Sequence, residues 1–103
     1  MEIKFDKEYL EDLYNDGKAK NKKYRFQPQV VKKYQRRIDT LAAVTGLEEL
    51  FTLNSVNFEA LESSDNYSIR IVSQYRLEFQ VNSSDVEPTI TICLIKDITN
   101  HFE

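Results

Sequence analysis

Apolar side chains recur at helical spacing near the start of the chain. The apolar positions of this first stripe are Tyr9, Leu10, Leu13 and Tyr14. This spacing predicts a helix whose apolar side faces a core. Asp6 is the expected N-cap, because its carboxylate can accept hydrogen bonds from the free amides of a first turn. Gly17 supplies the expected end of the helix.

A second and longer stripe at the same spacing begins shortly afterwards. It consists of Val30, Val31, Tyr34, Ile38, Leu41 and Ala42. Pro28 suits the first helical turn, where its missing N–H is not needed, and Gly46 suits the end. The pattern predicts a helix over residues 28–44 that packs its stripe on the rest of the protein. A short turn over residues 47–51 is expected to follow.

The period changes to two in the second half of the chain. Apolar and polar residues alternate over residues 67–71 and 75–81, and residues 89–95 are rich in β-branched side chains. These patterns predict three strands, and residues 3–5 predict a further short strand or extended entry. Helices followed by strands indicate an α+β domain, with two N-terminal helices packed on a small antiparallel sheet. At 103 residues, one domain over residues 1–103 is expected.

The first two of these strands are close enough to form a hairpin. A loop of Val72, Ser73 and Gln74 keeps the apolar residues of both strands on one face, whereas a loop of Ser73 and Gln74 alone does not. The three-residue loop pairs Ile71 with Tyr75, Ile69 with Leu77, and Tyr67 with Phe79.

The same register sets two like charges against each other on the opposite face. Arg70 falls directly opposite Arg76. Like charges directly opposed in a sheet destabilise it. Two interpretations stay open: either an anion lies near the two guanidinium groups, or Glu78 or Glu62 neutralises them.

Charge is distributed unevenly along the chain. The net charge is −3, yet residues 18–37 hold nine of the 14 Lys and Arg residues and none of the 17 Asp and Glu residues. A segment of this kind binds polyanions or acidic protein surfaces. The alternative is a solvated helix face and loop. The nine basic residues of this basic segment are Lys18, Lys20, Lys22, Lys23, Arg25, Lys32, Lys33, Arg36 and Arg37.

Several other classes of chemistry lack the residues that they need. With Gly17 and Gly46 as its two glycines, the chain has no Gly-rich phosphate loop. A single His and a single Cys do not make a usual zinc site, and Cys93 is expected to pack in the core. No apolar run reaches the roughly 18–20 residues of a membrane span, and the N-terminus lacks a signal-peptide pattern. We therefore expect a cytoplasmic protein with no metal, no cofactor and no membrane contact.

Three motifs of the sequence resemble one known family. The hairpin carries Leu61-x5-Tyr67-Ser68-Ile69-Arg70-Ile71, followed by Gln74-Tyr75-Arg76-Leu77-x-Phe79. It is preceded by Asn57-Phe58-Glu59-x-Leu61, and the chain ends with Ile98-Thr99-Asn100-His101-Phe102. These motifs, with the basic helix that begins near Pro28, resemble HigB-type toxins of the RelE/ParE superfamily of bacterial toxin–antitoxin systems. The likeness covers roughly residues 17–102.

The resemblance implies a RelE-like toxin that cleaves mRNA on the ribosome. It also implies a helix-turn-helix antitoxin that blocks the toxin and forms a hetero-oligomer with it. Metal-free cleavage by a 2′-hydroxyl needs a base, an acid and cations that stabilise the phosphorane. The resemblance places Arg70 and Arg76 as phosphate-facing arginines and His101 as the terminal active-site histidine, and Glu59 is a candidate base. The residues expected to contact RNA are Lys20, Lys22, Lys23, Arg25, Lys32, Lys33, Arg36 and Arg37.

Two alternatives remain beside the nuclease. Ala60, Glu62 and Ser63 stand where the resemblance leads us to expect lysines and a glycine. Together with the acidic second half, they favour a non-catalytic RelE/ParE-fold protein that acts only by binding a protein partner. An unrelated protein-interaction domain is the other alternative.

Overall fold

The computed structural model describes residues 1–50, 52, 59–60, 66–83, 86 and 90–100. The helices are α1 (Glu8–Asp16), α2 (Pro28–Ala43) and α3 (Leu47–Leu50), with a short 3₁₀ turn, η1 (Lys22–Tyr24), between the first two. The strands are β1 (Glu2–Phe5), β2 (Glu59–Ala60), β3 (Tyr67–Val72), β4 (Tyr75–Ser83) and β5 (Thr91–Asn100). None of the helices within these ranges is long and apolar enough to cross a membrane.

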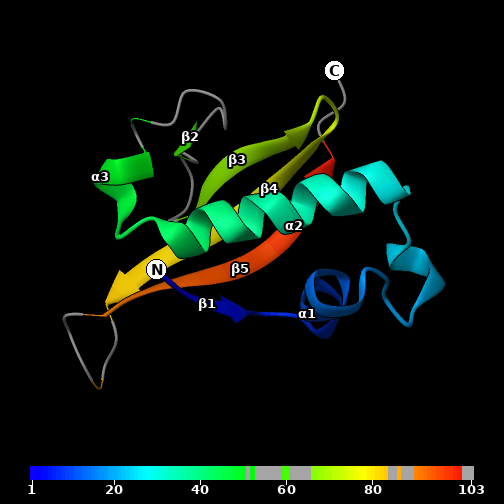
Figure 1. The fold of residues 1–103 in the computed structure, drawn as a ribbon, viewed down its shortest axis with the longest axis horizontal. Coiled ribbons are helices and arrows are strands. Elements are labelled where there is room, and N and C mark those ends of the chain that lie inside the picture. The colour runs from blue at the N-terminus through cyan, green and yellow to red at the C-terminus, as the bar shows by residue number, and fades with distance from the viewer. Residues whose placement is uncertain (51, 53–58, 61–65, 84–85, 87–89, 101–103) are drawn as a thin grey trace.

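One sheet holds all of these strands, in the order β1-β5-β4-β3-β2. Figure 1 shows α2 lying across the sheet, with α1 beside the end of β1. The expected α+β class is confirmed, but the sheet is mixed rather than antiparallel. The reason is that β1, the first strand in sequence, pairs in parallel with β5, the last described strand. A parallel pair needs a long connection, which the helices and the other strands supply here.

The apolar stripe of α2 forms the centre of the core. Val31, Tyr34, Ile38 and Leu41 are all buried, as their helical spacing predicts. Burial of each such side chain contributes about 1.5–3 kcal/mol. The Tyr34 hydroxyl donates a hydrogen bond of 2.7 Å to the carbonyl of Leu10, which satisfies its polar atom and joins α2 to α1.

The helix ends follow the sequence signals with one exception. Pro28 is the first residue of α2, and Gly17 caps α1 in the left-handed conformation with φ of 77°. The prediction that Asp6 caps α1 is wrong. Lys7 is the N-cap residue and makes no side-chain cap, while the Asp6 carboxylate forms an ion pair of 3.2 Å with Lys96. The α2 helix ends at Ala43, one residue before the predicted end.

The hairpin of β3 and β4 has the predicted register along most of its length. Tyr67 pairs with Phe79, Ile69 with Leu77, and Arg70 with Arg76. The predicted pair of Ile71 with Tyr75 is wrong, because Val72 pairs with Tyr75 across a turn of Ser73 and Gln74. A register shift between Arg70 and Val72 accommodates the extra residue. This bulge lets a two-residue turn coexist with matched apolar faces.

The last strand is longer than its apolar pattern indicates. It runs through Lys96 and Asp97 to Asn100, well past the predicted end at Ile95. Phe79 pairs with Ile95 while Glu78 pairs with Asp97, so the register shifts at Lys96. An extra residue in one strand interrupts the alternation of apolar and polar side chains. The sequence pattern therefore did not indicate that β5 continues beyond Ile95.

Candidate functional site

Two rows of positions cross the sheet side by side. The first, called here the arginine row, consists of Arg70, Arg76 and Thr99, which are direct partners on β3, β4 and β5. The second contains Ser68, Glu78 and Asp97, with Glu59 of β2 opposite Ser68. Leu77 and Phe79 face the core, and side chains alternate along a strand, so Arg76 and Glu78 belong to the face away from α2.

Arg76 is a buried cation that hydrogen-bonds to Ser68. Its side chain is 7% exposed. Its Nε donates to the Ser68 hydroxyl at 2.9 Å, and its Nη2 donates to the Ser68 carbonyl at 3.4 Å. A buried charge requires such hydrogen bonds, because burial removes it from water. Arg70, its direct partner on β3, is exposed, so the two predicted phosphate-facing arginines differ in their surroundings.

The remaining predicted catalytic residues are only partly located. His101 and Glu62 lie outside the described residues. For Glu59 the backbone position is described. It lies on β2 directly opposite Ser68, the residue to which Arg76 hydrogen-bonds. The strand β5 brings Asn100 opposite Tyr75 at the same end of the sheet.

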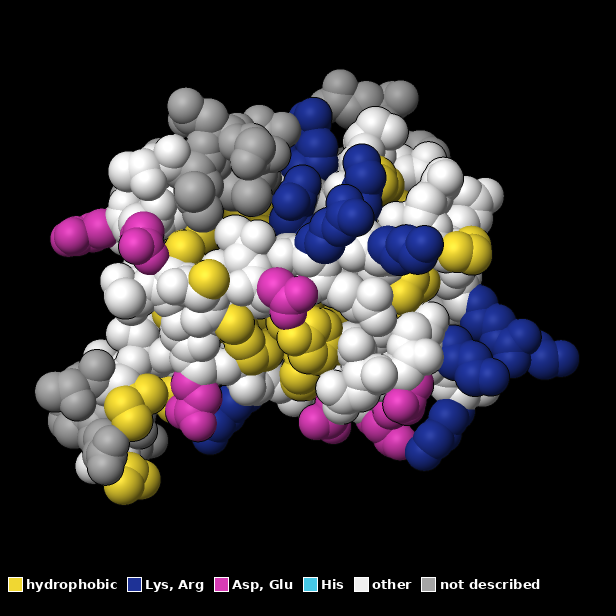
Figure 2. Space-filling view, in the orientation of Figure 1, with side chains coloured by type: hydrophobic (Ala, Val, Ile, Leu, Met, Phe, Trp, Pro, Cys, Tyr) yellow, Lys and Arg dark blue, Asp and Glu magenta, His cyan; other side chains and the backbone are white. Residues whose placement is uncertain are grey.

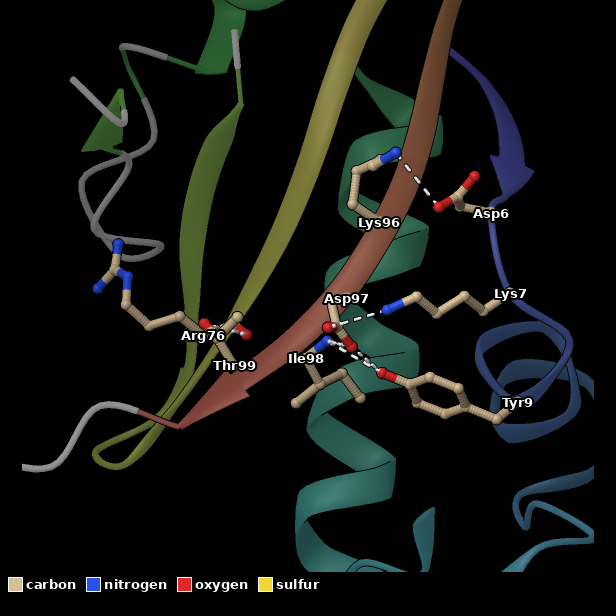
Figure 3. A network of polar contacts seen from close by, with 8 residues as sticks. All are labelled: Asp6, Lys7, Tyr9, Arg76, Lys96, Asp97, Ile98 and Thr99. Carbon is tan, nitrogen blue, oxygen red and sulfur yellow. Dashed lines mark hydrogen bonds and ion pairs between the residues drawn. The ribbon is translucent and has the colours of Figure 1, made fainter. Parts of the chain in front are cut away.

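A polar network that the sequence did not indicate joins α1 to β5 (Figure 3). The Tyr9 hydroxyl donates to Asp97 and accepts a hydrogen bond of 3.3 Å from the Ile98 amide. Lys7 forms an ion pair of 3.0 Å with the other carboxylate oxygen of Asp97. Figure 3 shows this network on one side of β5 and Arg76 pointing away from it on the other. The network therefore anchors the end of the strand that carries Thr99.

The electrostatics of this network favour a neutral tyrosine and an ionised aspartate. Burial, together with the hydrogen bond to Asp97, raises the pKa of Tyr9 above its ordinary value. Burial acts to raise the pKa of Asp97 as well, but the hydrogen bonds from Tyr9 and Lys7 outweigh it and lower that pKa. Asp97 is therefore a carboxylate at neutral pH, and its contacts with Lys7 and Tyr9 hold β5 against the start of α1.

The basic segment is largely exposed. Figure 2 shows Lys and Arg side chains in two groups, one over α2 and one over the connector that contains η1. Seven of the eight predicted RNA-contacting residues are exposed, and Arg37 is half-buried. Lys20 forms an exposed ion pair of 3.3 Å with Glu8, and Arg37 bonds to β3. Lys32, Lys33 and Arg36 form the outward basic surface of α2.

Cys93 has no features of a reactive thiol. It is fully buried on the core side of β5, and burial raises its pKa to about 12. A buried thiol that stays protonated at neutral pH is a poor nucleophile. Across the described ranges, no three His, Cys, Asp or Glu side chains are grouped as metal ligands would be.

Comparison with known proteins identifies the family. Residues 3–90 match the HigB-like toxins, described as the RelE-like toxin of the type II toxin–antitoxin system HigB. Among solved structures, a YoeB/ParE toxin from Agrobacterium tumefaciens is similar, with a TM-score of 0.58 and 15% identity over 99% of this chain and 100% of that chain. At this identity the likeness shows the fold alone. The comparison with curated proteins finds no match. Because the family match spans most of the sequence, the chain belongs to the HigB-like toxins, the RelE-like toxins of type II toxin–antitoxin systems.

Proposed function

We propose that this toxin is a ribosome-dependent mRNA endonuclease that acts in the cytoplasm and arrests growth until its antitoxin binds. Membership of the HigB-like toxins supports the toxin role. The observation that carries the nuclease role is the direct pairing of Arg70 with Arg76 on the sheet face opposite α2. Two arginines that are direct partners on one sheet face suit a phosphate, because each can donate charge-assisted hydrogen bonds to its oxygens.

The proposed reaction is an attack of the 2′-hydroxyl on the adjacent phosphate. The 2′-oxygen forms a bond to phosphorus while the bond to the 5′-oxygen of the next nucleotide breaks. The products are a 2′,3′-cyclic phosphate and a free 5′-hydroxyl. A base accepts the 2′-hydroxyl proton and an acid protonates the leaving oxygen, so the route uses no metal ion and no cofactor.

Each candidate residue has a defined role in this scheme. Arg76 and Arg70 stabilise the negative charge that develops on the phosphorane oxygens. His101 transfers a proton, because the ordinary pKa of histidine lies near neutrality. Glu59 is the candidate base, and its backbone position opposite Ser68 supports a place near Arg76.

The basic segment serves to bind the ribosome in this proposal. Lys32, Lys33 and Arg36 present three exposed cations along one helix, and the connector adds a second group. Such surfaces attract nucleic acid by neutralising phosphates and releasing counterions. A helix-turn-helix antitoxin forms a hetero-oligomer with the toxin and blocks this activity.

A second candidate function has one observation in its favour. Arg76 is buried and hydrogen-bonded to Ser68, which is also the condition of an arginine with a structural role. On that reading the toxin acts only by binding a protein partner. The two candidates differ in whether the residues proposed for chemistry are needed for toxicity.

Induced expression separates the two functions. Wild-type protein should arrest growth, whereas Arg76→Ala and His101→Ala should permit it while still binding the antitoxin. Lys4→Ala is the matched control, because Lys4 is an exposed cation on β1 and lies outside the arginine row. Full growth arrest by both variants would contradict the nuclease and favour the binding-only toxin.

A further inference from the structure

Ser68 and Arg76 are the two polar or charged residues that are buried in the described part of the chain. Ser68 is 0% exposed and Arg76 is 7% exposed. Two atoms of the one serine, Oγ and the carbonyl oxygen, accept from two nitrogens of the guanidinium at 2.9 and 3.4 Å. Two bonds from a rigid planar group to one residue fix both its direction and its plane.

The contact runs diagonally across the hairpin. In register, Ser68 is the partner of Glu78, and Arg76 is the partner of Arg70. The Arg76 side chain therefore leans along the sheet toward the neighbouring row rather than straight across to Arg70. Diagonal neighbours on one sheet face lie within reach of long side chains. The Arg76 guanidinium is thus bonded to a residue of the row next to the one that contains Arg70.

We propose that Ser68 is a positioning residue that sets the orientation of the Arg76 guanidinium and its separation from Arg70. The inference rests on the proposed nuclease function, in which these two arginines flank the scissile phosphate. An arginine side chain that is not held samples many rotamers, and ordering it again has an entropic cost. Electrostatic stabilisation of a transition state depends on groups that are already in place before the reaction.

The hydroxyl rather than the mere volume of Ser68 is the essential part. Replacement by Ala leaves the carbonyl oxygen in place but removes the acceptor of the shorter bond, to Nε. The guanidinium then keeps the longer bond from Nη2 to the Ser68 carbonyl but loses the bond that directs its Nε. Because Arg76 itself remains, substrate binding should change little and the chemical step should suffer.

The test measures cleavage of ribosome-bound mRNA by purified toxins, with kcat and KM determined separately. Ser68→Ala should lower kcat by about 10²-fold at nearly constant KM, the scale of a misplaced catalytic group. Thr40→Val is the control, because it removes a hydroxyl that bonds to the Arg36 carbonyl within α2. Its kcat should equal that of the wild type. Thermal melting and antitoxin binding establish that each variant is folded.

A double-mutant cycle separates positioning from a merely structural role. If Ser68 acts through Arg76, the variant that carries both Ser68→Ala and Arg76→Ala should be no slower than Arg76→Ala alone. Additive losses would overturn the proposal. So would an unchanged kcat in Ser68→Ala where Arg76→Ala is inactive, and in that case the nuclease function would stand. A wild-type rate for Arg76→Ala would overturn both.

A conservative variant decides the matter if Ser68→Ala does not fold. Ser68→Thr keeps the hydroxyl and suits a strand, because β-branched residues pack well on a pleated surface. Its kcat should stay within about tenfold of the wild type, since the acceptor for Nε is preserved. A folded Ser68→Thr with a larger loss of kcat would overturn the role of the hydroxyl.

Discussion

The Nε of Arg37 donates a hydrogen bond of 2.8 Å to the carbonyl oxygen of Arg70, and thereby joins α2 to β3. This bond lies beside the register shift between Arg70 and Val72. It connects the helix that carries the basic surface with the strand that begins the arginine row. Arg37 therefore has a structural role in addition to its charge, unlike its exposed neighbour Arg36.

Removal of this hydrogen bond should affect stability. Arg37→Ala should lower the free energy of unfolding by about 0.5–1.5 kcal/mol, the usual net value of one hydrogen bond. Arg36→Ala removes the same charge from an exposed position and should cost less than about 0.5 kcal/mol. Urea denaturation followed by circular dichroism measures both. Equal effects of the two substitutions would show that the bond to Arg70 contributes nothing.

The Tyr9 hydroxyl should contribute to the stability of the fold through two hydrogen bonds. Tyr9→Phe removes a donor to Asp97 and an acceptor for the Ile98 amide. We expect a loss of about 1–3 kcal/mol in the free energy of unfolding, because two hydrogen bonds are lost and each contributes about 0.5–1.5 kcal/mol. Tyr14→Phe is the matched control, since its hydroxyl bonds to Asp39 at an exposed site. A smaller loss for Tyr9→Phe than for Tyr14→Phe would contradict this account.

The pH dependence of stability should report on Asp97. Its pKa in the folded protein is lowered, since the hydrogen bonds from Tyr9 and Lys7 outweigh the effect of burial. A lowered pKa gives stability that is present above the unfolded pKa of about 3.9 and is lost as pH falls through the folded pKa. The wild type should therefore exceed Asp97→Asn in stability at neutral pH, and the difference should shrink below about pH 4. A difference that stays constant from neutral pH to strong acid would exclude this contribution.

Ribosome binding should depend on salt through the basic surface of α2. Replacing Lys32, Lys33 and Arg36 together by Gln should flatten the slope of log affinity against log salt by about 0.7–0.9 for each phosphate that the toxin no longer neutralises. Lys4→Gln, an exposed charge on β1, should leave the slope unchanged. Binding of labelled toxin to ribosomes over a series of salt concentrations gives the slopes. If the triple variant retains the wild-type slope, another surface contacts the RNA.

The hairpin and its arginine pair were predictable because strand periodicity fixes which residues share a face. The pairing of Arg70 with Arg76 could therefore be predicted from the sequence. The bulge at Ile71 could not be predicted, because the geometry of the turn rather than the strand periodicity determines where the bulge lies. The parallel pairing of β1 with β5 could not be predicted either, since a short alternating segment does not indicate which strand it pairs with.

The contacts that position the site were harder to foresee. Tyr9 and Asp97 are 88 residues apart in sequence, and neither belongs to a motif that names the other. The bond from Arg76 to Ser68 is diagonal, whereas the register identifies only direct partners. One feature of the sequence indicated Ser68 indirectly as a partner of Arg76. It is a small polar residue in the hairpin that resembles the family, and it lies on the same face as both arginines.

The chemical nature of the cut ends tests the central claim most directly. Purified toxin should cleave mRNA on programmed ribosomes and leave a 2′,3′-cyclic phosphate and a 5′-hydroxyl, because the 2′-hydroxyl is the proposed nucleophile. Arg76→Ala should lower the rate by about 10²–10³-fold, the cost of removing one electrostatic donor from a transition state. The result that would contradict the account is intact mRNA with the wild-type toxin, or cleavage by Arg76→Ala at the wild-type rate.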